Sequence, residues 1–376
     1  MTASATPIEM LRPPRIEFGA GTAPRLGDWA RERGLGRILV VTSPSVASML
    51  PRLGLPGEVT TFAEAKPEPD MPNLDALLAV AGRVRPELVV GFGGGSAMDL
   101  AKLAAVLPGS GQGIRDVVGP ERVAGRSVAL AQVPTTAGTG SEGGTRALVT
   151  DPATLSKLAV QSRHMLADIA VVDPELTFSV PAALTAATGV DALAHCVEAF
   201  TSRRAHPLID LYALEGIRLV GRFLPRAVAD GRDAEARAGL MLASMYGGFC
   251  LGPVNTTAGH AVAYPLNTRL HMAHGLACAL VFPHTLAFNA PAVPERTALI
   301  LDALGAPASA DPAAVRDAAL AFCAGLGMEM RLSRHGVPAD ALPAMAEEAH
   351  GIRRLLDWNP RDISAAGILD LYRAAL

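Results

Sequence analysis

Residues 88–102 read LVVGFGGGSAMDLAK, an apolar stretch that passes through three consecutive glycines into a second apolar stretch. The β-branched residues of Leu88–Gly93 predict a strand buried on both faces, and Ala97–Val106 is typical of a helix that follows such a strand. A glycine-rich turn between them lets backbone N–H groups approach a phosphate at the helix N-terminus. Because Ser96 stands where the dinucleotide fingerprint has its last glycine, a merely tight strand–helix turn is the alternative.

The first half of the chain repeats this alternation of strand and helix. Apolar runs at Arg37–Thr42, Val128–Val133 and Ile169–Val172 predict further strands, and Met71–Arg85 carries its leucines at helical spacing. Near-continuous hydrophobic strands joined by helices are typical of a parallel sheet that is covered on both faces. We therefore expect residues 1–180 to form an α/β nucleotide-binding domain.

The pattern changes after Pro174, where long segments rich in alanine and leucine replace the short apolar runs. These segments are Ala182–Thr201, Leu208–Ala229, Ala234–Cys250, Val315–Leu326 and Ile363–Ala375. Their length and composition predict helices. We expect residues 181–376 to form an all-helical domain, with the boundary near residue 180.

Composition narrows the class of protein. Half of the 376 residues are hydrophobic and 18% are charged, which excludes a disordered chain. The net charge of −3 comes from interspersed acids and bases, so no nucleic-acid or anionic membrane partner is indicated. The four cysteines lie far apart among apolar neighbours, which favours reduced, buried thiols. With no apolar run near the length of a membrane span, we expect a soluble cytoplasmic enzyme.

A second polar loop, PTTAGTGSE at residues 134–142, follows the next apolar run. Its hydroxyls and glycines suit a loop that wraps phosphate and ribose oxygens, and an ordinary loop with Ser/Thr turns is the alternative. Loops that follow successive parallel strands share one end of a sheet, where open α/β sheets bind ligands. The two loops together favour nucleotide binding.

The histidines form the strongest pattern. Asp191 and His195 are spaced i, i+4 in a strongly helical segment, so they share one face. Such a pair alone is more often a surface ion pair than a metal site. Four further histidines lie close together in apolar sequence: His260, His271, His274 and His284. One aspartate with three histidines (Asp191, His195, His260 and His274) suits Fe²⁺ or Zn²⁺ and leaves a position open for a substrate oxygen.

These motifs resemble the iron-containing (group III) alcohol dehydrogenases, relatives of dehydroquinate synthase and glycerol dehydrogenase. The resemblance runs from IEFGAG at Ile16 to Asn359-Pro360-Arg361. The motifs that carry it are GGGSAMDLAK at 93–102, PTTAGTGSE at 134–142, DIAVVDPELT at 168–177, GVDALAHCVEAF at 189–200 and GHAVAYPLNTRLHMAHG at 259–275. The resemblance implies the dehydroquinate synthase-like fold, an α/β domain with a parallel sheet followed by an all-α metal-binding domain, and a homodimer.

The resemblance also implies roles for individual residues. The metal ligands that it implies are the four residues of the histidine pattern, Asp191, His195, His260 and His274. The cofactor-binding residues that it implies are Gly94, Gly95, Ser96, Asp99, Thr135, Thr136 and Thr139. Lys157 matches a lysine on the nicotinamide side of the cofactor, and an exposed strand-edge lysine is the alternative.

The chain departs from the family pattern at two positions. Tyr264 stands where many members have a histidine, and it could relay a proton or simply cap a buried hydrogen bond. His271 is the other candidate for the relay, or else a surface histidine. Ser43 stands where NAD-preferring relatives often have an aspartate for the ribose hydroxyl, so NADP is as plausible as NAD.

The function that the resemblance implies is a metal-dependent, NAD(P)-linked oxidoreductase. It would interconvert a small, largely apolar alcohol and its aldehyde or ketone by hydride transfer in an interdomain cleft, with Fe²⁺ favoured over Zn²⁺. Tyr264-Pro265 also occurs in hydroxyacid–oxoacid transhydrogenase-like relatives, and a maleylacetate reductase-like enzyme is a further alternative. A dehydroquinate-type synthase is disfavoured because residues 255–285 offer only Arg269 besides histidines. A nucleotide-binding scaffold without turnover is the non-enzymatic alternative.

Overall fold

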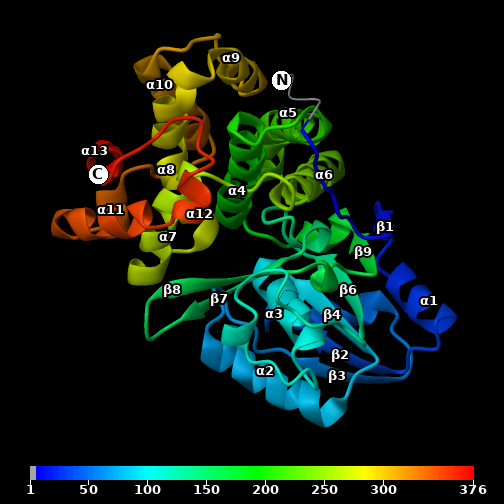
Figure 1. Ribbon diagram of the computed structural model, residues 1–376. Coiled ribbons are helices and arrows are strands. Elements are labelled where there is room, and N and C mark those ends of the chain that lie inside the picture. Colours follow the sequence, from blue (N-terminus) through cyan, green and yellow to red (C-terminus); the bar gives the residue numbers. More distant parts are fainter. Residues whose placement is uncertain (1–5) are drawn as a thin grey trace. The chain divides into compact units, whose positions relative to one another are not determined.

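The computed structural model describes residues 6–376, which divide into two compact units. One unit is Met10–Ser179, and the other is Val180–Leu376 together with residues 6–9. Figure 1 shows the first as a sheet with helices and the second as a set of helices. The division falls where the hydropathy pattern of the chain changes.

The first unit is built on a six-stranded sheet with the order β1-β9-β6-β4-β2-β3, and every neighbouring pair is parallel. The strands are β1 (Arg15–Phe18), β2 (Arg37–Val41), β3 (Glu58–Phe62), β4 (Leu88–Gly93), β6 (Ala129–Pro134) and β9 (Ile169–Val172). The helices of this unit are α1 (Arg25–Glu32), α2 (Met71–Val84) and α3 (Gly95–Val106). The predicted parallel α/β sheet is confirmed. The ends of the four predicted strands differ from those of β2, β4, β6 and β9 by at most one residue, and β1 and β3 were not among the predicted strands.

Alternate residues of the central strands supply two cores, one on each face of the sheet. Leu39 and Val89 pack with leucines of α2 and α3, such as Leu77. On the other face, Ile38 packs with Trp29 of α1. Burial on both faces explains why these strands are continuously hydrophobic in the sequence.

A second, three-stranded sheet was not predicted. Its order is β5-β8-β7, and it consists of β5 (Gly119–Pro120), β7 (Arg146–Asp151) and β8 (Ser156–Gln161). β7 and β8 form an antiparallel pair in which the residues of β7 are alternately buried and partly exposed. Such a half-buried strand lacks the continuous apolar run by which the other strands were recognised.

The second unit is all-helical, as expected. Its helices are α4 (Ala182–Thr201), α5 (Pro207–Ala229), α6 (Ala234–Leu251), α7 (Ala258–Leu270), α8 (His274–Asn289), α9 (Pro294–Ala303), α10 (Pro312–Gly325), α11 (Leu342–His350), α12 (Arg353–Leu356) and α13 (Ala365–Ala375). Three helix starts differ from the prediction: α5 begins one residue earlier, and capping residues set the starts of α10 and α13. Asp311 accepts from the Ala314 amide and starts α10 at Pro312, while Ser364 accepts from the Gly367 amide and starts α13 at Ala365.

Short 3₁₀ helices join these elements. They are η2 (Ala47–Leu53), η3 (Ile114–Asp116), η4 (Ser141–Gly143), η5 (Arg163–Met165), η6 (Pro174–Thr177), η7 (Ala290–Ala292), η8 (Leu332–His335) and η9 (Ala339–Ala341). Of these, η4 bears on the site, because it ends the polar loop that follows β6.

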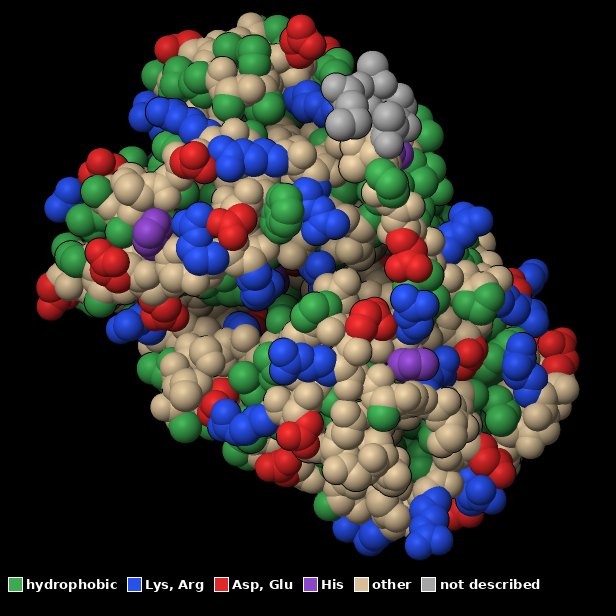
Figure 2. Space-filling model, viewed as in Figure 1, with side chains coloured by type: hydrophobic (Ala, Val, Ile, Leu, Met, Phe, Trp, Pro, Cys, Tyr) green, Lys and Arg blue, Asp and Glu red, His purple; other side chains and the backbone are tan. Residues whose placement is uncertain are grey.

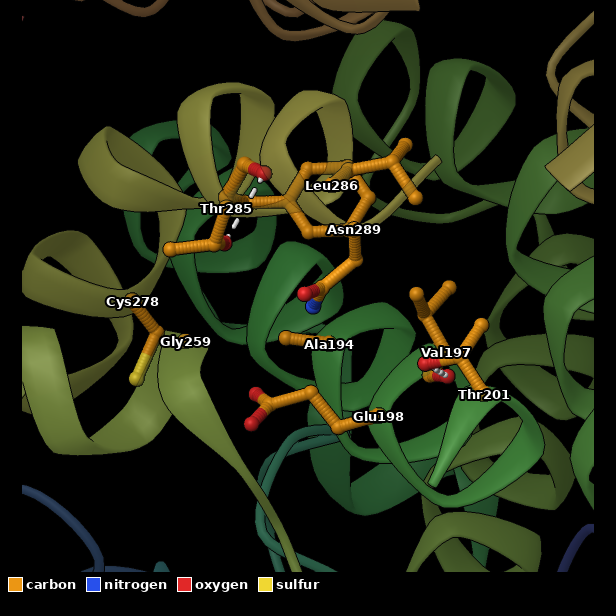
Figure 3. A pocket seen from close by; sticks show the side chains of 10 residues that line it. Ala194, Val197, Glu198, Thr201, Gly259, Cys278, Thr285, Leu286 and Asn289 are labelled. Carbon is orange, nitrogen blue, oxygen red and sulfur yellow. Dashed lines mark hydrogen bonds between the residues drawn. The ribbon is translucent and has the colours of Figure 1, made fainter. Parts of the chain in front are cut away.

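Helix α4 is the centre of the helical unit, and almost every residue from Thr185 onward is buried. It packs against α5, α6 and α8. A small cavity of about 10 Å³, room for one water molecule, lies beside it and is lined by α4, α7 and α8 residues (Figure 3). Glu198 of α4 reaches towards this space opposite Gly259 and Cys278.

The segment His274–Ala292 corrects one expectation. By length and by its mean hydropathy of 1.2 it could cross a membrane, so the statement that no apolar run reaches such a length is wrong. Of its residues, 72% are buried within the fold, which is typical of the core helix of a globular unit. The absence of a membrane partner stays a prediction.

The surface and the thiols agree with the composition. All four cysteines, Cys196, Cys250, Cys278 and Cys323, are free and buried. Figure 2 shows acidic and basic side chains interspersed over the face in view. The predicted reduced, buried cysteines are therefore confirmed.

Gly91 allows α3 to approach β4 closely, and this contact is testable. A Cβ at Gly91 would lie 2.2 Å from the Gln132 Oε1 atom and 2.9 Å from the Met98 Cα atom. We expect Gly91→Ala to lower the free energy of urea unfolding by about 1–3 kcal/mol. Gly82→Ala in α2, where a Cβ meets nothing within 4 Å, should be neutral or stabilising. Equal stability of the two variants would contradict this account.

Candidate active site

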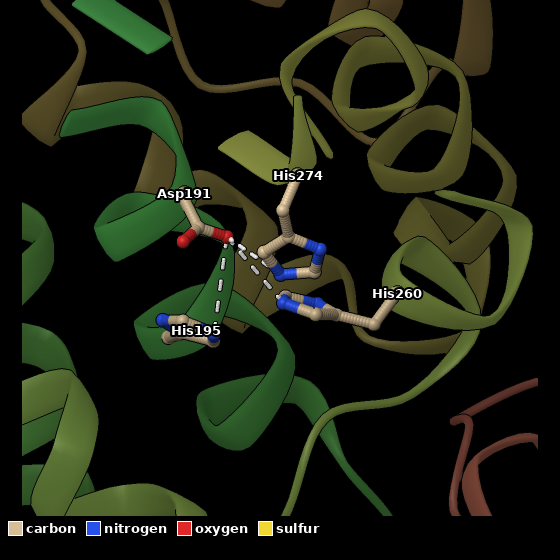
Figure 4. Close-up of side chains that lie close together, drawn as sticks. All are labelled: Asp191, His195, His260 and His274. Atoms are coloured by element: carbon tan, nitrogen blue, oxygen red, sulfur yellow. Dashed lines mark ion pairs between the residues drawn. The ribbon is translucent and has the colours of Figure 1, made fainter. Parts of the chain in front are cut away.

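Four side chains from three helices meet inside the helical unit. Asp191 and His195 lie one turn apart on α4, His260 is in the first turn of α7, and His274 begins α8. The Asp191 Oδ1 atom lies 3.8 Å from His195 Nε2, 3.5 Å from His260 Nε2 and 3.6 Å from His274 Nε2. Figure 4 shows the three imidazoles converging on this one oxygen. The structure thus brings together the four residues predicted as metal ligands.

The donor atoms of this cluster fit a divalent cation. One donor atom from each residue lies within 4.8 Å of the others. Donor atoms that bind one divalent cation at about 2.1 Å lie roughly 3–4 Å from one another, which matches the distances between Asp191 and the three imidazoles. Asp191 Oδ1, His195 Nδ1 and His260 Nε2 are buried and have no hydrogen-bond partner among residues 6–376. Buried donors without a partner are costly, and a bound cation would satisfy the two that face the cluster, Asp191 Oδ1 and His260 Nε2.

The pKa values of Asp191 and His195 are shifted so that each side chain is deprotonated near pH 7, the form that binds a metal. Burial by itself raises the pKa of Asp191, but the neighbouring His195 and His274 lower it well below its ordinary value. Burial lowers the pKa of His195 to about 4, so this imidazole is neutral near pH 7. For His260, burial lowers the pKa, but Cys278 and Glu198 more than offset it, so the net pKa is raised. A proton and a cation therefore compete for the His260 ring.

Glu198 is a member of this site that the sequence reasoning missed. Its side chain is 8% exposed, and its Oε1 atom lies 2.5 Å from the His260 Nδ1 atom. A signal was present in the sequence, because Asp191, His195 and Glu198 are spaced i, i+4, i+7 and so share one face of α4.

Tyr264 lies beside the cluster, whereas His271 is exposed to solvent at the end of α7. The Tyr264 ring centroid is 6.5 Å from that of His260 and 6.1 Å from that of His274. Burial raises the Tyr264 pKa, but Arg354 of α12, with its Cζ atom 5.6 Å from the ring centroid, and the histidines lower it below its ordinary value. His271 is exposed and ends α7 in a left-handed conformation. The geometry therefore favours Tyr264 over His271 as a proton relay, and Arg354 was not foreseen.

In the α/β unit, the two loops predicted to bind a nucleotide contact each other. They follow the paired strands β4 and β6, and the Thr135 amide donates to the Gly93 carbonyl. A Cβ at Gly95 would lie 2.6 Å from Thr139 Cγ2, and one at Gly94 would lie 3.4 Å from Thr136 Oγ1. The glycines at the start of α3 therefore let the two loops pack closely against each other, and the predicted contact of this backbone with a phosphate stays a prediction.

Two buried residues, Lys102 and Ser141, and the partly buried Asp99 hold these loops in place. The Ser141 hydroxyl donates to the Asp99 carboxylate (2.6 Å), which also accepts from the Leu148 amide (2.9 Å). The Lys102 ammonium, 1% exposed, donates to Ser141 Oγ and to the Arg146 carbonyl. Asp99 is thus engaged within the protein, which suits a residue that fixes the loops. Its predicted contact with a cofactor stays a prediction.

The remaining predicted cofactor residues lie around these loops. Lys157 of β8 is 5% exposed and pairs with Glu68, so the alternative of an exposed lysine is wrong. The Ser96 hydroxyl accepts from the Glu68 amide at 3.2 Å, which links Lys157 to the glycine loop. Ser43 follows β2, and its hydroxyl lies 3.0 Å from the Ser45 hydroxyl.

Comparison with known proteins gives a consistent result across the chain. Residues 13–174 match the family described as iron-containing alcohol dehydrogenase, and residues 185–376 match the C-terminal part of the Fe-containing alcohol dehydrogenase family. Long-chain-alcohol dehydrogenase 1 of Geobacillus thermodenitrificans is 36% identical over 96% of this chain and 95% of its own length.

Solved structures agree. A 1,3-propanediol oxidoreductase superposes with a TM-score of 0.93 at 31% identity, covering 99% of this chain and 100% of its own. A sulfoacetaldehyde reductase of Bifidobacterium kashiwanohense in complex with NAD⁺ superposes with a TM-score of 0.87 at 29% identity, covering 99% of both chains. The fold and the site define an oxidoreductase of the dehydroquinate synthase-like class. The chain belongs to the iron-containing alcohol dehydrogenase family.

Glu142, at the end of the second loop, makes the stability of the α/β unit depend on pH. Its side chain is 1% exposed, its Oε2 atom has no hydrogen-bond partner among residues 6–376, and burial raises its pKa from 4.5 to about 7. Between these two values the folded protein binds more protons than the unfolded chain. Stability contributed by the protonated group is therefore present below pH 4.5 and is lost as the pH rises through 7.

We expect Glu142→Gln to remove this dependence. The variant should gain stability relative to the wild type between pH 5 and pH 8, by at most about 3 kcal/mol, because an amide carries no charge at either pH. Urea unfolding of both proteins at the two pH values measures the effect. A stability difference that is the same at pH 5 and pH 8 would show that Glu142 does not titrate in this range.

Proposed function

We propose that this protein is a metal-dependent, nicotinamide-linked dehydrogenase that interconverts a small alcohol with its aldehyde or ketone. The observation that carries the proposal is the convergence of Asp191 with three imidazoles. Two of the buried donor atoms at the centre have no hydrogen-bond partner in the described part of the chain. The two touching loops after β4 and β6 supply the second requirement, a place for the dinucleotide. Family membership supports both.

Each group of residues has a distinct task in this function. When bound, a divalent cation supplies Lewis acidity to the substrate oxygen, and a nicotinamide ring exchanges hydride. Asp191, His195, His260 and His274 hold the cation and leave room for a substrate oxygen. The backbone at Gly94 and Gly95 meets the phosphates at the N-terminus of α3. Tyr264, beside His260 and His274, is placed to take up or return the hydroxyl proton.

We extend the proposal to the identity of cofactor and metal. Ser43 presents a hydroxyl and no carboxylate, so a 2′-phosphate meets no negative charge there, and both NAD and NADP are candidates. Fe²⁺ is the favoured metal and Zn²⁺ the second, since carboxylate and imidazole donors accept either. Lys157, buried against Glu68, is the candidate contact on the nicotinamide side.

We also propose a cytoplasmic homodimer with no nucleic-acid or membrane partner. β1 forms one edge of the six-stranded sheet, and Phe18 at its end is 37% exposed. An edge strand offers backbone groups to which a second copy can add a strand. Sedimentation of a variant with Ile16→Pro, which removes one backbone donor from β1, tests this route.

The central experiment is an anaerobic turnover assay on metal-stripped protein. We expect nicotinamide reduction with small alcohols to return when Fe²⁺ or Zn²⁺ is added, with NAD⁺ or NADP⁺ as acceptor. Metal-loaded protein that exchanges hydride between two substrates without added nicotinamide would favour the transhydrogenase-like alternative, to which Tyr264-Pro265 also points. Protein that binds neither metal would remove the basis of the proposal.

The proton relay is tested by Tyr264→Phe. We expect kcat to fall by about 100-fold or more and one limb of the pH–rate profile to disappear, because phenylalanine cannot carry the proton. Tyr246→Phe, in the aromatic group formed with Tyr212 and Phe249, is the matched control and should keep the wild-type profile. If Tyr264→Phe keeps that profile and His271→Ala loses it, the relay is His271.

A further inference from the structure

We propose that Glu198 fixes the His260 imidazole in the one orientation and tautomer that leaves Nε2 free for a metal, and thereby controls how tightly the metal is held. Glu198 is then a positioning residue: it reaches the cation only through His260. The inference rests on the proposed metal centre and adds to it a residue that contributes no ligand atom.

The contacts of Glu198 determine the direction of its hydrogen bond to His260. One carboxylate oxygen, Oε2, accepts from the Thr257 amide (2.5 Å), the Thr257 hydroxyl (3.2 Å) and the His260 amide (3.3 Å). The other, Oε1, lies 2.5 Å from His260 Nδ1. Because an ionised carboxylate only accepts, the imidazole must donate its Nδ1–H.

In the neutral ring, which is the form that binds a metal, this donation determines the state of Nε2. A neutral imidazole has one N–H, so a proton on Nδ1 leaves a lone pair on Nε2. That atom is buried, lies 3.5 Å from Asp191 Oδ1 and has no hydrogen-bond partner among residues 6–376. The lone pair therefore points at the centre of the donor cluster. A carboxylate that orients a metal-binding histidine in this way raises its basicity as a ligand.

The local sequence makes room for this contact. A Cβ at Gly259 would lie 2.6 Å from Glu198 Oε1 and 3.0 Å from its Cδ atom, so any larger residue before His260 would displace the carboxylate. The Glu198 side chain, which comes from α4, also caps the N-terminus of α7. Its Oε2 atom accepts from the Thr257 and His260 amides, which have no partner within that helix. The contact between Glu198 and His260 therefore depends on the absence of a side chain at Gly259.

Charge balance gives Glu198 a second effect on the metal. Asp191 and Glu198 are both almost completely buried, and together they place two negative charges near the four donor atoms. These charges match those of a divalent cation in a site with little water to screen it. Removing one of them weakens cation binding even where the donor atoms stay in place.

Glu198→Gln is the direct test because it changes charge and donor pattern with little change in shape. The amide oxygen is needed at the Oε2 position, where three donors meet, so the NH₂ group falls against His260 Nδ1. Two donors then face each other unless the ring moves its proton to Nε2, which blocks metal binding. We expect the affinity for Zn²⁺ and Fe²⁺ to fall by about 10- to 100-fold.

Metal affinity is measured by competition with a chelator of known affinity. The protonation of the two His260 ring nitrogens is measured by ¹H–¹⁵N spectra of zinc-loaded protein with labelled histidine. The wild type should show a strongly hydrogen-bonded Nδ1–H at His260, and Glu198→Gln should lose it. Gly259→Ala, which displaces the carboxylate but keeps its charge, should weaken zinc binding in the same direction. Thr201→Val is the matched control on α4. The Thr201 hydroxyl donates to the Val197 carbonyl and to no other group among residues 6–376, so this variant should bind zinc like the wild type.

The outcomes separate this inference from the proposed function. A wild type that binds neither metal overturns the metal centre itself. A wild type that binds zinc through His260 without a proton on Nδ1 overturns the role of Glu198. Unchanged zinc affinity in folded Glu198→Gln also overturns it. If Glu198→Gln fails to fold, the Gly259→Ala affinity and the wild-type spectrum decide the question.

Discussion

The Asp191 carboxylate, buried in the middle of α4, sets the main constraint on the helical unit. A carboxylate removed from water needs opposite charge or hydrogen-bond donors close by. Among residues 6–376, its Oδ1 atom has no hydrogen-bond partner, and three imidazole nitrogens lie 3.5 to 3.8 Å away, too far for strong hydrogen bonds. The positions of α7 and α8 are consistent with an ion bound at this point, because each helix contributes one histidine from its first turn. Glu198 is the second buried carboxylate of α4, and it meets the same need for nearby donors through the Thr257 and His260 groups.

The sequence predicted most of this architecture, since the strands and the long helices are buried in ways that leave clear hydrophobic patterns. It also predicted the four clustered residues, because aspartate and histidine are rare inside apolar helices. The β7–β8 pair was missed because alternate burial gives a weak signal in six residues. Arg354 was missed for another reason. It approaches Tyr264 from a helix 90 residues further along the chain, and no local spacing reports such a contact.

Glu198 falls between these cases. It stands within the quoted stretch GVDALAHCVEAF and on the same face of α4 as Asp191, yet a glutamate near a helix end is usually exposed. Only the three-dimensional contact with His260 shows that it belongs to the site. A carboxylate that hydrogen-bonds to a metal ligand differs from a surface carboxylate in its hydrogen-bond partners. Its position in the sequence does not distinguish the two. Residues of this kind are therefore the hardest part of a metal site to find from sequence.

The network around Lys102 has a consequence for changing the cofactor preference of this enzyme. Lys102, Asp99 and Ser141 connect α3, the second loop and β7, so a substitution in either loop disturbs the other through a buried charge. The turn at Ser43 lies outside this network, and the side-chain bond it makes is to Ser45 in the same turn. Directed evolution of nucleotide specificity should therefore find its tolerated changes in the turn after β2, while the loops stay almost invariant.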